Sequence, residues 1–315
     1  YNGYTHGLSV KNNDIFFSSS AGKYSVILKS RVNFKQIEDE GLKNIKFLNA
    51  LEAKYHNERV HGICFDSSRR MLCVANTKRN SILFLEPNSG SISKEIFLMK
   101  DQSGFFISVD HNNINNVFEY NGIIFFTMHN GALGKKKRGG SLIGITDLKC
   151  VYFYEYHRRG IHDIFFDGKN LIFSDSFGYF ENLQSKKNIS GMPIKNGKEL
   201  KKFFFSKLEN NYCIRGFSYS NIEMLVGCSS ISARRSERLI LPGGLSLIKE
   251  NKAYFLKSKF SQVFEIEKIN FTEKEKKNKK TNLITLDKKL EKLIGKKKLI
   301  INTENNIIQT TLIKR

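Results

Sequence analysis

Residues 61–99 read HGICFDSSRRMLCVANTKRNSILFLEPNSGSISKEIFLM and divide into four short apolar segments separated by turn-forming residues. Short alternating segments bounded by Ser, Asn, Pro and Gly are typical of β-strands. Four such strands within about 40 residues make one antiparallel blade of the kind that repeats in propeller arrays. The stretch therefore predicts a four-stranded sheet that recurs along the chain.

The recurrence is visible in the residue that leads the first strand of each unit. A histidine precedes an apolar, strand-like segment four times at intervals of about 50 residues, and a fifth copy carries arginine instead. These leader residues are His6, His61, His111, His162 and Arg215. The pairs Asn121-Gly122 and Asp167-Gly168 add hairpin signals, because a tight type I′ turn needs positive φ at both central residues. A sixth unit, which lacks a His or Arg leader, is expected over residues 244–266.

Six units predict an all-β protein, a six-bladed β-propeller with four-stranded antiparallel blades around a central channel. Seven blades are the alternative, if the C-terminal segment builds a blade of its own. We expect instead that residues 299–313 supply a strand that closes the ring with the first blade, because closure removes exposed sheet edges. Residues 272–298 break the alternating pattern and are predicted to form a lysine-rich insertion or a short helix. Residues 1–315 then form a single domain.

The composition narrows the classes of partner. The chain carries 52 Lys and Arg against 30 Asp and Glu, a formal net charge of +22. Such an excess suits an acidic partner. Abundant Lys, Asn and Ile without Trp is, however, the composition expected from an AT-rich genome, so a nucleic-acid partner is not predicted. No run of about 18 apolar residues is present, and no membrane span is predicted.

The five cysteines include no CxxC pair and are interpreted as buried, reduced thiols. A reducing, cytoplasmic location and a monomer are the default expectations. The chain starts at Tyr1, which we interpret as a trimmed N-terminus.

The sequence resembles the six-bladed propellers of the gluconolactonase-like, strictosidine-synthase-like and NHL-repeat group. The resemblance is carried by His-Gly-Ile-x-Phe-Asp, Val-Ala-Asn, Ile-Leu-Phe-Leu and Gly within residues 61–90. A closer resemblance is to an uncharacterised bacterial propeller family with His-Gly and Arg-Gly blade leaders. The late element is here residues 214–217, followed by residues 226–229 and a basic stretch.

The resemblance covers most of residues 1–268 and implies the fold rather than an activity, because propellers host many unrelated chemistries. Calcium-dependent lactonases place acidic and asparagine ligands in their channel. That acidic set is not identifiable in this sequence, so lactonase activity is not expected.

Blades share one axis, so equivalent residues of successive blades should converge on the central channel. We predict that His61, His111, His162 and Arg215 form a catalytic group, with imidazoles that exchange protons and a guanidinium that grips carboxylate or phosphate. Further ligand contacts are predicted from strand ends and from an arginine-rich segment: His6, His129, Asn76, Asp175, Arg234 and Arg235.

Two other interpretations of the leader histidines stay open. The first is a divalent metal in the channel, such as iron, zinc or manganese, because neutral imidazole is a common metal ligand. Its ligands would be His6, His61, His111 and His162. The second is structural: each leader bonds a neighbouring blade, and a residue that builds blades should recur in every blade.

The sequence therefore predicts a propeller that binds a small polar or anionic ligand in a His- and Arg-lined central pocket. Lyase, hydrolase and isomerase chemistry are the candidate activities. The alternative is a non-catalytic scaffold that binds a protein or an acidic polymer through one face. The two differ in what the leader side chains contact: a ligand pocket, or the backbone of neighbouring blades.

Overall fold

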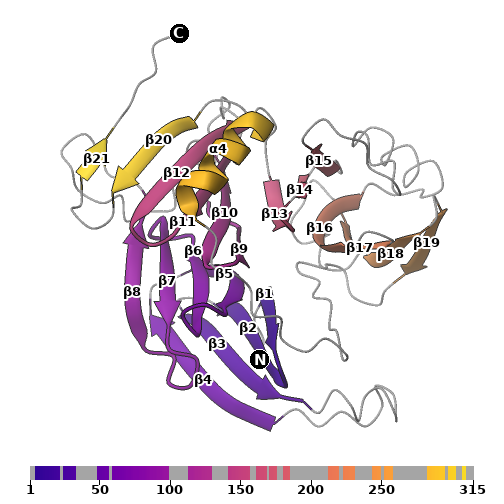
Figure 1. The fold of residues 1–315 in the computed structure, drawn as a ribbon. Coiled ribbons are helices and arrows are strands. Elements are labelled where there is room, and N and C mark those ends of the chain that lie inside the picture. Colours follow the sequence, from indigo (N-terminus) through magenta and orange to yellow (C-terminus); the bar gives the residue numbers. More distant parts are fainter. Residues whose placement is uncertain are drawn as a thin grey trace.

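The computed structural model describes residues 4–21, 24–32, 48–56, 59–98, 113–129, 141–156, 161–168, 170–175, 180–184, 212–219, 223–230, 243–249, 252–257, 282–294, 297–302 and 307–309. These residues form five antiparallel sheets and one helix (Figure 1).

In each sheet, strands that follow one another in the chain lie side by side, and the third sheet also contains two strands from the C-terminal region. The first sheet contains β1 (Tyr4–Lys11), β2 (Asp14–Ala21), β3 (Tyr24–Arg31) and β4 (Leu48–His56). The second contains β5 (Val60–Asp66), β6 (Met71–Asn76), β7 (Ser81–Leu85) and β8 (Ile92–Phe97). The third contains β9 (Asn116–Tyr120), β10 (Ile123–His129), β11 (Ser141–Thr146) and β12 (Cys150–Tyr156), followed by β20 (Lys297–Asn302) and β21 (Ile307–Gln309). The fourth contains β13 (Ile161–Phe166), β14 (Asn170–Asp175) and β15 (Phe180–Gln184). The fifth contains β16 (Tyr212–Tyr219), β17 (Glu223–Ser230), β18 (Gly244–Lys249) and β19 (Lys252–Lys257).

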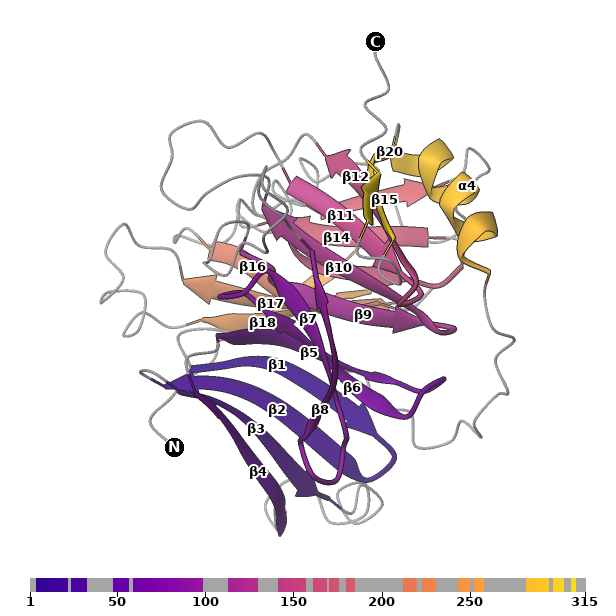
Figure 2. The ribbon, with the colours of Figure 1, turned by 90° about the vertical axis from the view of Figure 1, so that its left-hand side faces the viewer.

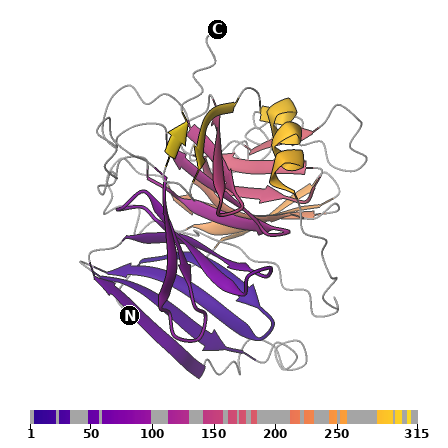
Figure 3. The same cartoon turned by 60° about the vertical axis from the view of Figure 1, so that its left-hand side comes forward.

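The first strands of successive sheets pack against one another. Strand β5 lies against β1, β9 against β5, β13 against β9 and β10, and β16 against β13 and β14. Figures 2 and 3 show the indigo first sheet below and the magenta and pink third and fourth sheets above. The protein is an all-β propeller built from antiparallel, mostly four-stranded sheets, as the sequence predicts.

The number of sheets differs from the prediction, because the described residues form five rather than six or seven. The predicted sixth unit is the outer half of the fifth sheet, since β18 pairs with β17 and β19 pairs with β18. It lacks a leader because it contains no innermost strand. The long connection between β17 and β18 gives the appearance of a blade boundary in the sequence.

The C-terminal strand also differs from the prediction. Strand β20 pairs with β12, and β21 pairs with β20, so this segment extends the third sheet instead of joining the first. The outer edge of β12 would otherwise present unpaired backbone groups, and β20 satisfies them. Apolar residues pair across this edge, as in Val151 opposite Ile301.

Helix α4 (Leu283–Ile294) lies within the segment for which an insertion or a short helix is predicted. Asn282 caps it, because its Oδ1 accepts the backbone N–H of Ile284 at 2.9 Å. Its buried face joins the apolar cluster between the third and fourth sheets through Leu283, Leu286 and Leu290. The helix is therefore part of the core and not a solvated insertion. No helix among the described residues has the length and apolar character needed to cross a bilayer.

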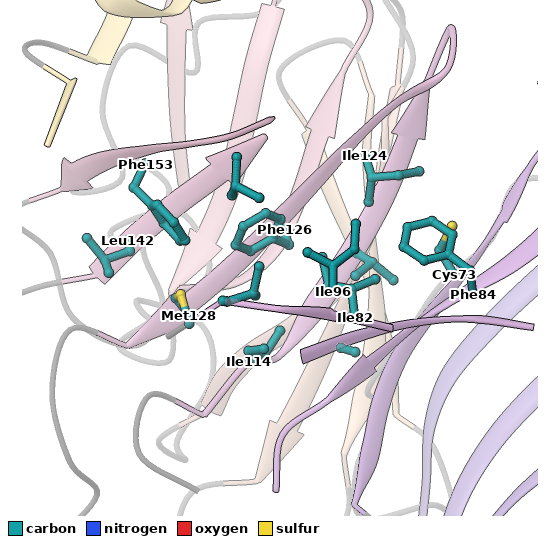
Figure 4. Close-up of a cluster of buried hydrophobic side chains, with 14 residues drawn as sticks. Cys73, Ile82, Phe84, Ile96, Ile114, Ile124, Phe126, Met128, Leu142 and Phe153 are labelled. Atoms are coloured by element: carbon teal, nitrogen blue, oxygen red, sulfur yellow. The ribbon is translucent and has the colours of Figure 1, made fainter. Parts of the chain in front are cut away.

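Apolar clusters fill the spaces between neighbouring sheets. Figure 4 shows the cluster that joins the second sheet, through residues such as Ile82 and Phe84, to the third, through Ile124 and Phe126. A Cβ on Gly144 would stand 1.9 Å from the Phe126 ring, so only glycine leaves room for it. Burial of these faces fixes the order of the sheets.

Candidate functional site

The leader residues stand at β-bulges in the innermost strands. The register between first and second strand shifts around His6 in β1, His61 in β5, His162 in β13 and Arg215 in β16. A bulge adds a residue to one strand and re-aims its side chain. A β-bulge therefore orients the leader side chain in four of the five sheets.

In the third sheet the leader position belongs to an asparagine. In the first and fourth sheets, the residue that follows the leader lies opposite a serine of the second strand, Ser18 and Ser174 respectively. In the third sheet the small residue at that place is Thr127, and it lies opposite Asn116. The residue before Asn116, Asn115, therefore holds the leader position. The alignment of this unit on His111, which lies earlier in the chain and outside the described residues, is therefore out of register.

Side chains from all five sheets nevertheless converge. The ring centroids of His6 and His61 lie 4.5 Å apart. His129, at the end of β10, supplies the histidine of the third sheet, and its ring centroid lies 6.4 Å from that of His162. Arg215 acts electrostatically on both His61 and His162. We call these five residues the central cluster.

The environment of His61 favours the neutral imidazole. The side chain is 9% exposed. Burial holds its pKa well below the usual value, and the positive charges of His6, Arg59 and Arg215 lower it further. A hydrogen bond to the backbone of Ile114 acts in the opposite direction. The second ring nitrogen, Nε2, has no hydrogen-bond partner among the described residues.

His162 is shifted in the same direction. Burial lowers its pKa well below the usual value, and Arg215, His129 and His61 add to the effect. Two histidines from different sheets thus experience the same positive surroundings. Such a region attracts anions.

Hydrogen bonds between neighbouring sheets surround the central cluster. Ser18 Oγ donates to the backbone carbonyl of His61. The Gly62 N–H donates to the carbonyl of Asn115 at 3.0 Å, and Asn115 Nδ2 donates to the carbonyl of Ile161 at 3.1 Å. Backbone groups and small polar side chains beside the leaders thus take part in linking the sheets. One nitrogen of His61 takes part as well.

How closely the next sheet approaches decides which amino acid can stand directly after the leader. A Cβ on Gly7 would stand 2.7 Å from the carbonyl oxygen of His61, and one on Gly62 would stand 2.7 Å from Cα of Asn116. Glycine is required at these two contacts. In the third and fourth sheets the same position holds Asn116 and Asp163, whose side chains bridge the gap at 2.8 Å.

Asp163 joins three sheets at the edge of the central cluster. Its carboxylate accepts Asn116 Nδ2 from the third sheet, the N–H of Phe217 from the fifth at 2.9 Å, and the N–H of Ile164 in its own strand at 2.9 Å. Burial raises its pKa to about 7, against the opposing effect of the Phe217 and Ile164 hydrogen bonds. The predicted set of site residues contains neither Asp163 nor Arg59; for Asp163, the change from glycine to Asp after a leader is the signal in the sequence.

Of the other predicted site residues, the structure describes Asn76 and the backbone of Asp175. Asn76 Oδ1 accepts the N–H of Arg59 at 3.5 Å, a local contact at the start of β5. Asp175 ends β14, where its backbone pairs with Ile161. Arg234 and Arg235 lie outside the described residues, as His111 does.

The predicted metal quartet cannot be assembled in full without His111. Within the part of the chain that the structure describes, no group of three or more His, Cys, Asp or Glu side chains is arranged to hold a metal ion.

Comparisons with known proteins do not assign a family. No family model matches the chain, and no curated protein does. A protein of unknown function from Bacteroides caccae aligns with a TM-score of 0.47 and 10% identity over 84% of this chain and 86% of its own. The computationally designed Ika8 protein aligns with a TM-score of 0.41 and 10% identity over 84% of this chain, which spans 65% of that protein.

Sqt1 from Saccharomyces cerevisiae aligns with a TM-score of 0.40 and 7% identity over 81% of this chain and 76% of its own. All three scores are low, so the fold assignment rests on the sheets of this chain. The six-bladed group and the bacterial family that the sequence resembles stay predictions. On its own sheet order and strand packing, the protein is a β-propeller.

Proposed function

We propose that the protein binds a small anionic ligand at the central cluster. The observation that carries the proposal is the convergence of one His or Arg side chain from each of the five sheets. Burial lowers the pKa of His61 and His162, and the positive groups brought together beside them lower it further. A bound anion would offset the effect of these positive groups.

The side chains suit a carboxylate or a phosphate. The planar guanidinium of Arg215 offers paired N–H donors that match either group. His61 Nε2 supplies a further donor once the ring takes up a proton. Anion binding raises the pKa of the imidazoles, so binding should be accompanied by proton uptake and should tighten as the pH falls toward 6.

Calorimetric titration with sodium acetate and with inorganic phosphate tests the proposal. We expect Arg215→Ala to weaken binding at least about tenfold, the loss of one charge-assisted contact. Arg79→Ala is the matched control, because Arg79 pairs with Glu95 at 3.1 Å in the second sheet, away from the cluster. Titration in two buffers of different ionisation enthalpy measures the proton uptake. The proposal fails if neither anion binds the wild-type protein, or if folded Arg215→Ala binds as tightly as Arg79→Ala.

Catalysis would require the same residues. Imidazoles held neutral are proton acceptors, so His61 and His162 fit the acid–base roles expected of them in a lyase, hydrolase or isomerase. These activities stay predictions until a ligand is known.

A second candidate is a scaffold that binds a protein through the fifth sheet. Tyr254 is 57% exposed and Leu256 is 68% exposed, and both lie on β19, the last strand of that sheet. Alternate residues of a strand project from the same face, so the two form one exposed apolar pair. A scaffold role predicts that replacing both by Ser abolishes partner binding and leaves anion binding unchanged.

A further inference from the structure

We infer that the anion bound at the central cluster carries an aromatic ring, and that this ring packs against Phe118, Phe165 and Tyr219. The inference rests on the proposed anion binding and names the class of ligand: an aryl-alkyl carboxylate or a phosphate ester of similar shape.

Three aromatic side chains form a row across the innermost strands. The ring centroids of Phe118 in β9 and Phe165 in β13 lie 5.4 Å apart, and those of Phe165 and Tyr219 in β16 lie 5.7 Å apart. Both pairs are tilted, an arrangement in which ring faces and edges attract. The row spans the third, fourth and fifth sheets.

The aromatic row shares β13 and β16 with the central cluster, and Phe165 lies on the same side of β13 as Asp163. Ile161, Ile164 and Phe166 point into the apolar cluster shared with the third sheet. Asp163 and Phe165 alternate with them, and both contact the fifth sheet.

Within the fourth sheet, the bulge at His162 aligns this member of the central cluster with Phe165. In a regular strand His162 and Phe165, three residues apart, would project from opposite faces. The extra residue at the bulge removes one step of that alternation, so the two side chains come to the same side. Three residues of strand span about 10 Å at most. A carboxylate joined to a ring by a short alkyl chain has this reach.

The aromatic row keeps apolar surface accessible. Phe118 and Phe165 are only partly buried although they lie on innermost strands, whereas Tyr219 is 8% exposed. Partly exposed rings beside an electropositive group are suited to a ligand with an anionic head and an aromatic body. A simple inorganic anion would leave this surface unused.

Titration with three probes measures separately how much the anionic group and the aromatic ring contribute to affinity. Acetate provides the head alone, 3-phenylpropionate provides head and ring, and 3-phenylpropanol provides the ring alone. We expect 3-phenylpropionate to bind about tenfold or more tightly than acetate, the gain typical of one buried aromatic contact. Phenylpropanol should bind more weakly than phenylpropionate, since it lacks the anion.

Substitutions then test whether the aromatic row accounts for the gain in affinity. Phe165→Leu keeps apolar volume but removes the ring, and it should lower the affinity for phenylpropionate toward that for acetate while leaving acetate binding unchanged. Phe165→Ala should act in the same way if it folds. Phe97→Ala, on β8 beside Arg79, is the control and should keep the full difference.

The outcomes distinguish this inference from the proposed function. If acetate binds and phenylpropionate binds no more tightly, the inference is wrong and anion binding stands. The same holds if phenylpropionate binds tightly but folded Phe165→Leu retains the whole gain. If neither carboxylate binds, the proposed function itself fails.

Discussion

Replacing Asp163 by Ala should destabilise the propeller more than most single substitutions. The carboxylate accepts three hydrogen bonds at 2.8 to 2.9 Å, two of them from neighbouring sheets. A buried donor left without an acceptor costs about 1–3 kcal/mol. The Phe217 N–H and the Asn116 amide would both lose theirs. We expect a loss of about 3 kcal/mol at pH 8, a large part of the 5–15 kcal/mol typical of a folded protein.

The loss should depend on pH in a defined direction. The pKa of Asp163 is about 7 in the folded protein and 3.8 is its ordinary value, so the folded state holds this proton more tightly. The contribution of Asp163 to stability is therefore fully present below about pH 3.8 and decreases as the pH rises through 7. Between pH 5 and 7 the change is about 1.4 kcal/mol per pH unit. The substitution should cost about 3 kcal/mol more at pH 5 than at pH 8.

Urea unfolding of wild type and Asp163→Ala at pH 5 and pH 8 measures both quantities. Asp167→Ala is the control, because that carboxylate is exposed one residue beyond β13 and should change stability by less than about 0.5 kcal/mol. A loss below about 1 kcal/mol at pH 8 would show that Asp163 does not join the sheets as argued. A loss that does not grow toward pH 5 would show that the pKa of Asp163 is not raised in the folded protein.

Three further substitutions or conditions test other contacts. The wild-type free energy of unfolding should fall by about 1.4 kcal/mol per pH unit below pH 6.5. His61 and His162 have lowered pKa values and take up two protons only on unfolding, whereas Asp163 already holds one proton in the folded state, so unfolding takes up one proton in total. A flat urea midpoint between about pH 6.5 and 5 would contradict this. Tyr154→Phe should cost about 1–3 kcal/mol in urea unfolding, because Tyr154 OH donates to the buried Asp287 of α4 at 2.5 Å; a cost under about 0.5 kcal/mol would mean that this bond does not anchor the helix. Gly7→Ala should lower the melting temperature by several degrees, on the order of 2 kcal/mol, because its Cβ would stand 2.7 Å from the His61 carbonyl; an unchanged melting curve would show that the two sheets can separate without cost.

Local sequence determined the strands, their turns and the repeated leaders of this protein. Alternation of apolar residues depends on burial of one strand face, and the Asn121-Gly122 turn depends on positive φ, which both residues adopt. Such signals span only a few residues, so they are readable without knowledge of the fold. They were enough to predict an all-β propeller with His and Arg side chains at equivalent places in successive units.

Tertiary structure decided how the strands are grouped and which side chains meet. Pairing of β18 with β17 and of β20 with β12 depends on edges brought together from distant parts of the chain, and sequence spacing carries no record of them. His129 is among the ligand contacts predicted from the sequence, but its contact with His162 from the end of a second strand, while Asn115 holds the leader position of its sheet, depends on the folded chain. A bulge shifts register by one residue and changes which face a side chain occupies, so the composition of the central cluster depends on pairing that only the folded chain establishes.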